Sequence, residues 1–339
     1  MKWIFMNLHG KYGLLVATAF SLLCPLLLAV AATETPKHLV LVSDPQYPWS
    51  DLTDEGLPGN DARAKELVEL QYSDIADFRR HNGGASRIPV MINGDITAFG
   101  HGSERSYMKE VFERKLEGIY DYGLGNHDYA NNVDDCFLNN CAAGSIVELK
   151  ERYWGKADSM DLGIRSSGLG RIYYGSLAYS KNFGDVHMVQ LHNEPTYAVE
   201  FSSGNPLGPT AFEITPALDW LERDLRSARQ QGKIIILNMH KVYDWKGTSE
   251  QIARFQQMIE TYRVTAIFGG HDHWGAGSWF DWGKSERFGY VPVFLSGSAS
   301  QQTYLIASFS DDKQSLAISV VRGNNWPSRK VVQTIPVMK

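Results

Sequence analysis

The sequence has no excess of positive charge, because 33 Lys and Arg residues stand against 38 Asp and Glu residues, for a formal net charge of −5. Such a mildly acidic chain does not suggest a broad nucleic-acid-binding face, so we expect no extended nucleic-acid interface. Beyond residue 31 the chain also lacks an apolar stretch long enough to cross a membrane. It contains no internal repeat, low-complexity segment or linker. A single catalytic domain over residues 32–339 is therefore the economical interpretation.

Cysteine is scarce as well. The protein has three cysteines, and only Cys136 and Cys141 lie beyond the N-terminal apolar segment. In an exported protein, two cysteines separated by four residues can form a small-loop disulfide. We predict this disulfide bond, with two free thiols as the alternative if the local geometry forbids the bridge.

The N-terminal segment resembles a secretory signal peptide. Lys2 and Lys11 provide a basic start, residues 13–31 are almost wholly apolar, and Ala29-Val30-Ala31 is a small-residue cleavage pattern. We predict a signal peptide over residues 1–31 and a secreted or periplasmic protein, with an uncleaved membrane anchor as the alternative. Cleavage leaves 308 residues with a formal net charge of −7.

The rest of the chain alternates between strand-like and helix-like segments, which indicates a layered α/β core. Residues 171–191 read as a hairpin with a turn at Gly184-Asp185. The other expected strands are 38–43, 88–92, 118–124, 233–237, 264–268, 291–295, 304–309 and 316–321, and the expected helices are 61–80, 104–115, 216–231 and 250–262.

Five short polar segments follow, in most cases, a β-type apolar run. They are Asp44-Pro45-Gln46, Gly94-Asp95, Gly125-Asn126-His127-Asp128, His240 and Gly270-His271-Asp272-His273. Ligands gather outside the carboxyl ends of strands in α/β sheets, so we expect these segments to form one site. Carboxylate, amide and imidazole groups are the ligands of a two-metal hydrolytic centre.

The order and types of these motifs resemble the calcineurin-like metallophosphoesterase superfamily, over nearly all of the chain after residue 31. The resemblance implies a four-layer α/β/β/α sandwich of two mixed β-sheets flanked by helices. It implies that Asp95 bridges two divalent ions. The first ion would be held by Asp44, Asp95, His273 and the residue at position 46, and the second by Asp95, Asn126, His240 and His271.

The implied reaction is hydrolysis of a phosphodiester or phosphomonoester by direct attack of a metal-bridging hydroxide, without a covalent enzyme intermediate. His127 is the candidate general acid for the leaving oxygen, with Asp128 orienting it. Alternatively, His127 only hydrogen-bonds the phosphoryl oxygens.

Gln46 departs from the family pattern, which usually has His at this position. An amide oxygen is a neutral, hard ligand, whereas imidazole suits Zn and Fe better. We therefore favour Mn, with Fe, Zn or Mg as other possibilities. Gln46 could ligate through its oxygen, a water could replace it, or the first site could be weak. In the last case a rival function is a vestigial phosphoesterase fold that acts as a secreted binding or toxin-like protein.

Substrate signals are few. Six aromatic residues follow the last motif, and they could stack on a nucleotide base, cover a phospholipid tail or simply pack a loop. They are Trp274, Trp279, Phe280, Trp282, Phe288 and Tyr290. Residues 131–140 form a polar loop beside the active-site turn and are a candidate for setting specificity. Of the remaining histidines, His101 is a candidate to line the cleft, and His187 and His192 are expected to be sheet residues.

Overall fold

The computed structural model describes residues 34–204, 208–243, 245–278 and 285–339, and Thr33–Lys339 forms one compact unit. The predicted signal peptide over residues 1–31 lies outside the described residues. Among the described residues, no helix combines the length and the apolar character that a membrane span requires.

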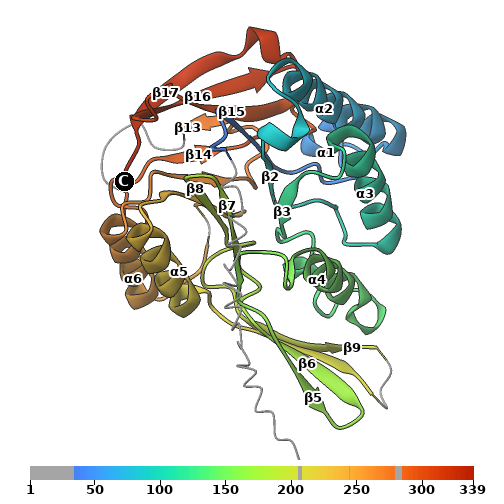
Figure 1. The fold of residues 1–339 in the computed structure, drawn as a ribbon. Coiled ribbons are helices and arrows are strands. Elements are labelled where there is room, and N and C mark those ends of the chain that lie inside the picture. The colour runs from blue at the N-terminus through green and yellow to red at the C-terminus, as the bar shows by residue number, and fades with distance from the viewer. Residues whose placement is uncertain (1–33, 205–207, 244, 279–284) are drawn as a thin grey trace, which may run out of the picture. The chain divides into compact units, whose positions relative to one another are not determined.

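The first sheet contains the three strands that lead into the first three motifs. Its strand order is β17-β16-β15-β1-β2-β3, with β1, β2 and β3 parallel to one another and β15 antiparallel to β1 (Figure 1). The strands are β1 (His38–Val42), β2 (Val90–Asn93), β3 (Asp121–Gly123), β15 (Thr303–Phe309), β16 (Ser315–Arg322) and β17 (Lys330–Pro336).

The second sheet contains the strands that lead into the last two motifs. Its order is β13-β14-β12-β11-β8-β7-β4, and β8, β11, β12 and β14 run parallel. The strands are β4 (Ser159–Met160), β7 (Tyr179–Phe183), β8 (Val186–Gln190), β11 (Ile234–Asn238), β12 (Ala266–Gly269), β13 (Gly277–Ser278) and β14 (Val293–Leu295).

Side chains alternate along the strands between two apolar layers. In β1, Leu39 and Leu41 face the second sheet, where they join a buried cluster with Met188 and Ile236. Their neighbours Val40 and Val42 instead pack against helices α2 (Asp61–His81) and α3 (Gly102–Leu116). A strand with both faces covered is expected to be apolar along its whole length, with alternate side chains entering the two layers.

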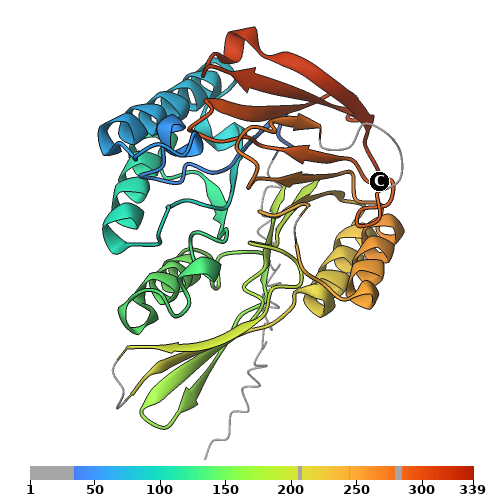
Figure 2. The ribbon, with the colours of Figure 1, turned by 180° about the vertical axis from the view of Figure 1, so that it is seen from behind.

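Helices α5 (Leu218–Gln230) and α6 (Ser249–Thr261) cover the outer face of the second sheet, where Leu221 and Phe255 join a cluster with Leu237. The two helix pairs therefore lie on opposite sides of the two stacked sheets (Figures 1 and 2). This arrangement confirms the predicted four-layer α/β/β/α class.

A smaller sheet extends from this core and was not expected from the sequence. Its order is β5-β6-β10-β9, formed by β5 (Gly163–Ser167), β6 (Gly170–Gly175), β9 (Val199–Ser203) and β10 (Thr210–Ile214). The predicted hairpin over residues 171–191 is therefore only partly right. Its turn at Gly184-Asp185 joins β7 to β8 as expected, but β6 pairs with β5 and β10 instead.

Helix α4 (Asn140–Tyr153) packs against this smaller sheet. A disulfide bond joins the segment before the helix to its first turn. Cys136 and Cys141 form the predicted disulfide, with their Cα atoms 5.8 Å apart. The loop over residues 131–140 also contains two short 3-10 turns, Ala130–Asn132 and Phe137–Asn139, and the remaining short helices are α1 (Asp51–Asp54), Ala85–Arg87 and Trp326–Ser328.

Candidate metal centre

The predicted ligands come from the carboxyl ends of both large sheets. Asp44, Asp95 and Asn126 follow β1, β2 and β3 of the first sheet, whereas His240 and His271 follow β11 and β12 of the second. Possible ligand atoms of Asp95, His240 and His271 all lie within 4.8 Å of one another. The two sheets therefore meet at one polar site, as the positions of the motifs at strand ends predicted.

Two buried carboxylates form the centre of this site. His240 Nε2 lies 3.0 Å from Asp95 Oδ2 and 4.0 Å from Asp44 Oδ1. His273 Nε2 approaches the same Asp44 Oδ1 at 3.5 Å. The other oxygen of Asp44 accepts hydrogen bonds from the Ser43 hydroxyl and from the His271 backbone N–H, the latter at 3.0 Å. Asp44 thereby connects the first motif to the last.

Four of the predicted ligands present a buried polar atom that has no well-aligned hydrogen-bond partner among the residues that the structure describes. These atoms are Asp44 Oδ1, Gln46 Oε1, Asn126 Oδ1 and His240 Nε2. Buried polar atoms are nearly always paired, so unpaired ones need an explanation. The three oxygens have a lone pair that could bind a cation, and so has His240 Nε2 once its proton is displaced, which means that the residues present fit a metal centre.

Three histidines of the site are oriented in the same way. The Nδ1 atom lies 2.8 Å from a carbonyl oxygen in His127 (Ala98) and in His240 (Asn93), and 2.6 Å from Asp54 Oδ1 in His273. Carbonyl and ionised carboxylate oxygens only accept, so each Nδ1 must carry the proton. The Nε2 atoms are then left for the site, which is the tautomer that metal-binding histidines use.

The backbone brings the loops unusually close together. Gly125 lies against Asp95, so that a Cβ at this position would overlap Asp95 Oδ1. A Cβ at Gly270 would likewise overlap the Ser43 hydroxyl and crowd Asp44. The glycines of these two motifs are therefore explained by close backbone approach to the carboxylates.

The comparison with known families agrees with this geometry. The sequence pattern described as calcineurin-like phosphoesterase matches residues 38–275, which includes all five motifs. The chain belongs to the calcineurin-like phosphoesterase family. A comparison with curated protein sequences gives no significant match.

Solved structures show the same fold as this calcineurin-like phosphoesterase. A purple acid phosphatase from yellow lupin (Lupinus luteus) seeds matches with a TM-score of 0.50 and 12% identity, over 89% of this chain and 55% of the lupin chain. The Plasmodium protein GAP50, described as the anchor in the inner membrane complex, matches with a TM-score of 0.50 and 10% identity, over 90% of each chain. This chain thus spans about half the length of the lupin phosphatase, and at these identities the likeness shows the fold alone.

The electrostatics of the phosphoesterase site reflect its clustered carboxylates. Burial opposes ionisation of Asp95, but the nearby His240 outweighs this effect and lowers the pKa of Asp95 to about 2. Burial likewise opposes the charge on His240 and His273, yet the adjacent carboxylates raise the pKa of His240 to about 9 and that of His273 to about 10. In the metal-free protein, the protons on His240 and His273 therefore place positive charge next to the buried carboxylates. Bound divalent cations would supply this charge in place of the two protons.

His271 differs from these two histidines. Its burial and the positive charge of His240 lower the pKa of His271 to about 4. A neutral imidazole is the form that binds metal, so His271 can act as a ligand without first losing a proton.

The expected role of Asp128 is not what the structure shows. We predicted that Asp128 orients His127, but the ring of His127 is held by the Ala98 carbonyl. The Asp128 carboxylate instead accepts hydrogen bonds from the backbone N–H groups of Gly125, Ile96 and Thr97 at 2.9–3.0 Å, and from the Thr97 hydroxyl. It joins the Asp95 loop to the Asn126 loop. Burial and the Asp95 charge raise the pKa of Asp128 to about 7.

Two residues near the site carry no motif signal and were missed. Asp54 of α1 receives hydrogen bonds at 2.7 Å from Trp49 Nε1 and at 2.6 Å from His273 Nδ1. The Trp49 ring lies edge-on to the rings of His127 and His273, with centroid distances of 5.7 and 6.0 Å. Neither residue is part of one of the five sequence motifs. The fold of the loop after Gln46 brings them to the site.

The other histidines have structural partners. His187 forms a buried ion pair with Asp224 at 2.8 Å, and His192 Nδ1 accepts the Leu124 N–H at 3.1 Å, immediately before the Asn126 motif. His101 precedes α3, bonds Glu104, and lies beside the disulfide sulfurs. His187 belongs to β8, as expected, whereas His192 lies in a turn after β8 and is not the sheet residue that the sequence predicted. His101 has a contact that accounts for its orientation.

The aromatic cluster after the last motif divides into two groups. Trp274 and Tyr290 are exposed, at 62% and 75%, whereas Phe288 is buried and packs edge-on against Phe255. The packing interpretation therefore holds for Phe288. Trp279, Phe280 and Trp282 lie outside the described residues.

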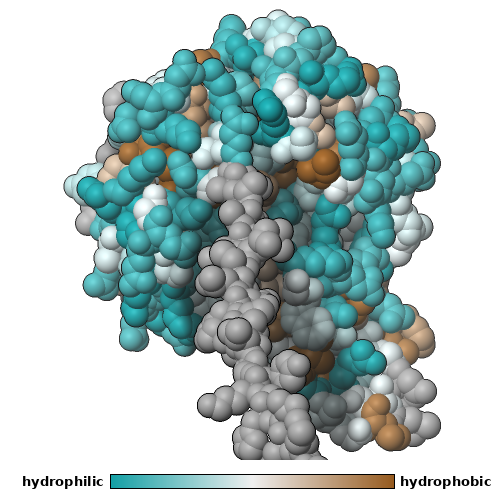
Figure 3. Space-filling model, in the orientation of Figure 1, coloured by the Kyte–Doolittle hydropathy of each residue, from teal (hydrophilic) through white to brown (hydrophobic). Residues whose placement is uncertain are grey.

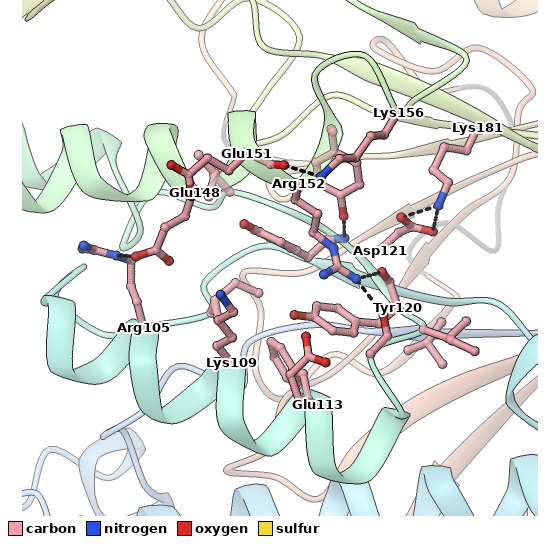
Figure 4. Close-up of a pocket in the computed structure, with 18 of the residues that line it drawn as sticks. Arg105, Lys109, Glu113, Tyr120, Asp121, Glu148, Glu151, Arg152, Lys156 and Lys181 are labelled. Carbon is pink, nitrogen blue, oxygen red and sulfur yellow. Dashed lines mark hydrogen bonds and ion pairs between the residues drawn. The ribbon is translucent and has the colours of Figure 1, made fainter.

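A cavity of about 690 Å³ is lined by residues of α3 and α4 (Figure 4). None of the seven predicted metal ligands lines it, although Asp128 does. Two ion pairs belong to its lining, Arg105 with Glu148 at 2.9 Å and Lys181 with Asp121 at 2.8 Å. This cavity is thus distinct from the candidate metal centre.

Proposed function

We propose that the protein is an exported phosphoesterase that uses two divalent cations, with Mn favoured, to hydrolyse a phosphodiester or phosphomonoester. Membership of the calcineurin-like phosphoesterase family supports the reaction class. The substrate, the metals and the mechanism are proposals that rest on the site itself.

The convergence of buried, unpaired ligand atoms carries this proposal. Among the residues that the structure describes, Asp44 Oδ1, Gln46 Oε1, Asn126 Oδ1 and His240 Nε2 have no well-aligned hydrogen-bond partner. An unsatisfied buried polar atom costs about 1–3 kcal/mol. Four of them at the ends of neighbouring strands are readily explained if a cation binds there.

The ligands divide between two cation sites that share Asp95. We assign Asp44, Gln46, Asp95 and His273 to the first site, and Asp95, Asn126, His240 and His271 to the second. When bound, two such cations supply a nucleophile at neutral pH and stabilise negative charge on the phosphoryl group. The carboxylates of Asp44 and Asp95 leave part of the cationic charge for an anionic substrate.

His127 is the group we propose to protonate the leaving oxygen. Its Nδ1–H is held by the Ala98 carbonyl, and its backbone N–H donates to Asp95 Oδ1 at 2.8 Å. Its position is therefore tied to a shared ligand, while Nε2 can carry the transferred proton. The edge of Trp49 limits movement of the ring on one side.

Export is a separate part of the proposal. It rests on the signal-peptide pattern of residues 1–31, and the disulfide between Cys136 and Cys141 agrees with an oxidising compartment. N-terminal sequencing of protein recovered from its natural host tests this part. We expect a mature protein that begins close to residue 32, whereas an intact Met1 end would contradict cleavage.

The substrate class is best tested on Mn-loaded purified protein with nitrophenyl mono- and diesters, nucleotides and phospholipids. On the face shown in Figure 3, hydrophilic residues predominate and hydrophobic ones form small separate areas. Preferential turnover of one ester class would identify the physiological type.

The ligand assignment predicts that Asp95→Ala and His240→Ala abolish hydrolysis while the protein remains folded. His187→Ala is the matched control, because it removes a buried, carboxylate-paired histidine from the same sheet that supplies His240. We expect the control to retain metal and activity. Wild-type rates in both site variants would refute the assignment. Absence of both metal binding and activity in the wild-type protein would favour the binding or toxin-like alternative.

A further inference from the structure

The Asp54 carboxylate lies at the meeting point of three segments. It belongs to α1, eight residues after Gln46, and its side chain is 3% exposed. Asp54 Oδ1 accepts hydrogen bonds from Trp49 Nε1 at 2.7 Å and from His273 Nδ1 at 2.6 Å. Asp54 Oδ2 accepts from Gln301 Nε2 at 2.6 Å. The carboxylate is thus held in place from both sides.

Asp54 gives His273 a different partner from the other oriented histidines of the site. The Nδ1 atoms of His127 and His240 face the neutral backbone carbonyls of Ala98 and Asn93. Only His273, among these three, has a carboxylate behind it. A carboxylate partner makes an imidazole a stronger electron donor at its other nitrogen than a carbonyl does.

The histidine with the carboxylate partner belongs to the cation site that has the poorer ligand set. In our assignment, Gln46 and His273 belong to the same site, and the amide oxygen of Gln46 is a poorer ligand than the imidazole usual at that position. The second site has two histidines, His240 and His271, and has no such deficit. The stronger electron donation of His273 therefore occurs in the same site as the poor ligand Gln46.

We propose that Asp54 is a positioning residue that fixes the ring of His273 and strengthens it as a ligand, so that it compensates for Gln46 in the first cation site. This proposal rests on the proposed two-metal function. Trp49 contributes through the same carboxylate, because its Nε1–H holds Asp54 Oδ1 in line with His273.

The test is a titration of the metal-free full-length protein with Mn²⁺ against a competing chelator, which resolves two affinities. We expect Asp54→Ala to weaken one of the two Mn sites by about 10-fold to 100-fold and to leave the other unchanged. Asp54→Asn keeps an oxygen for the Nδ1–H but loses the charge, so we expect a smaller loss at the same site. Asn126→Ala is the reference that weakens the other site.

Asp77→Asn is the matched control. Asp77 Oδ2 accepts the Trp326 Nε1–H at 2.8 Å, which is the same kind of Trp–Asp contact, but it lies on α2 outside the metal motifs. The control should bind two Mn with wild-type affinities. Thermal unfolding of the metal-free variants shows whether each one is folded at the titration temperature.

A purely structural role would give a different result. If Asp54 only stabilises the loop, Asp54→Ala lowers the melting temperature but both Mn affinities stay at the wild-type level, and this outcome overturns the proposal. Under the proposal, activity lost in Asp54→Asn returns at saturating Mn with little change in kcat. If the wild-type protein itself binds no Mn, the two-metal function fails, which is distinguishable from failure of the Asp54 proposal.

Discussion

Replacement of Asp128 by Asn tests whether this carboxylate holds the two metal-binding loops together. Oδ2 accepts the backbone N–H groups of Ile96 and Gly125, and Oδ1 accepts the N–H and hydroxyl of Thr97. An amide can offer an oxygen to only one of these pairs, since its NH₂ group must face the other. At best the Thr97 hydroxyl turns to accept from the new NH₂, and one buried backbone N–H remains unpaired.

The expected cost follows from these contacts. An unpaired buried N–H costs about 1–3 kcal/mol, and hydrogen bonds to a charged acceptor are stronger than neutral ones by about 1 kcal/mol each. Removal of an expensive buried charge offsets part of this sum. We expect a loss of about 2–4 kcal/mol, which lowers the melting temperature by roughly 3–6 °C in a unit of this size.

Thermal unfolding of the metal-free protein at pH 8 measures this effect, because that pH lies above the pKa of about 7 for Asp128, so the carboxylate is mostly ionised. Asp161→Asn is the matched control. Both donors of Ser176 converge on a single oxygen of Asp161, Oδ2, which an amide oxygen can replace. The control should lose less than about 1 kcal/mol.

The same variant separates the two roles considered for Asp128. If Asp128 anchors the loops, the substitution also weakens Mn binding, because Asp95 directly precedes the residues Ile96 and Thr97 that Asp128 holds. If Asp128 instead acted on His127, the substitution would change the pH profile of hydrolysis and leave stability and Mn affinity as in the wild type. A stability loss no larger than that of Asp161→Asn, with unchanged Mn affinity, would refute the reasoning.

Two further predictions concern the cation sites. The pKa values of about 9 for His240 and about 10 for His273 lie above the ordinary value of 6.5, so their stabilising contribution is complete below about pH 6.5 and is lost as the pH rises through 9 and 10. The melting temperature of the metal-free protein should therefore fall between pH 7 and 10, and saturating Mn should reduce this fall. A metal-free protein whose stability does not decline over that range would contradict the assignment of the charges. Gln46→His should raise the affinity of the first site for Zn by on the order of tenfold, or about 1.4 kcal/mol, measured by chelator competition; unchanged binding would place Gln46 outside the site.

The core and the convergence of the motifs could be predicted because both depend on local signals. The strand that ends at Val42 is a continuous apolar run, and a fully buried strand needs such a run whichever helices cover it. The position of Asp44 and Asp95 just after such strands then brings them together, because parallel strands end at the same edge of a sheet. The glycines at positions 125 and 270 complete the pattern, since only glycine fits beside the carboxylates.

The smaller sheet could not be predicted in the same way. Strand β6 pairs in parallel with β10, which lies beyond β7, β8 and β9 in the chain, so its partner is decided by packing and not by a neighbouring turn. The short strands β5 and β9 have many exposed positions, among them the last three residues of β5, which gives a weak apolar pattern. Tertiary context therefore decided how β5, β6, β9 and β10 pair.

The site residues that were missed or misassigned share one cause. Asp54 and Trp49 act through side-chain hydrogen bonds across loops, and no spacing in the sequence encodes that kind of contact. Asp128 was correctly placed at the site, but its neighbour in the chain, His127, suggested the wrong partner. A sequence does not show which backbone N–H groups will donate to a given side chain. Three such groups donate to Asp128.

The backbone conformation of the ligands indicates that the loops define the site before any metal arrives. Asp44, Gln46, Asp95 and His271 all have positive φ, between 40° and 72°. Residues other than glycine avoid this region, and each instance costs about 1–3 kcal/mol unless the surroundings enforce it. The surroundings do so here, because the backbone N–H groups of Asp44 and Gln46 are bound by the carbonyls of Gly94 and Asp95. A metal ion would then bind to side chains that are already oriented. The free-energy cost of ordering them is therefore part of folding and not of binding. A weak ligand such as Gln46 is tolerable under this condition, since little binding free energy must be spent on moving it into place.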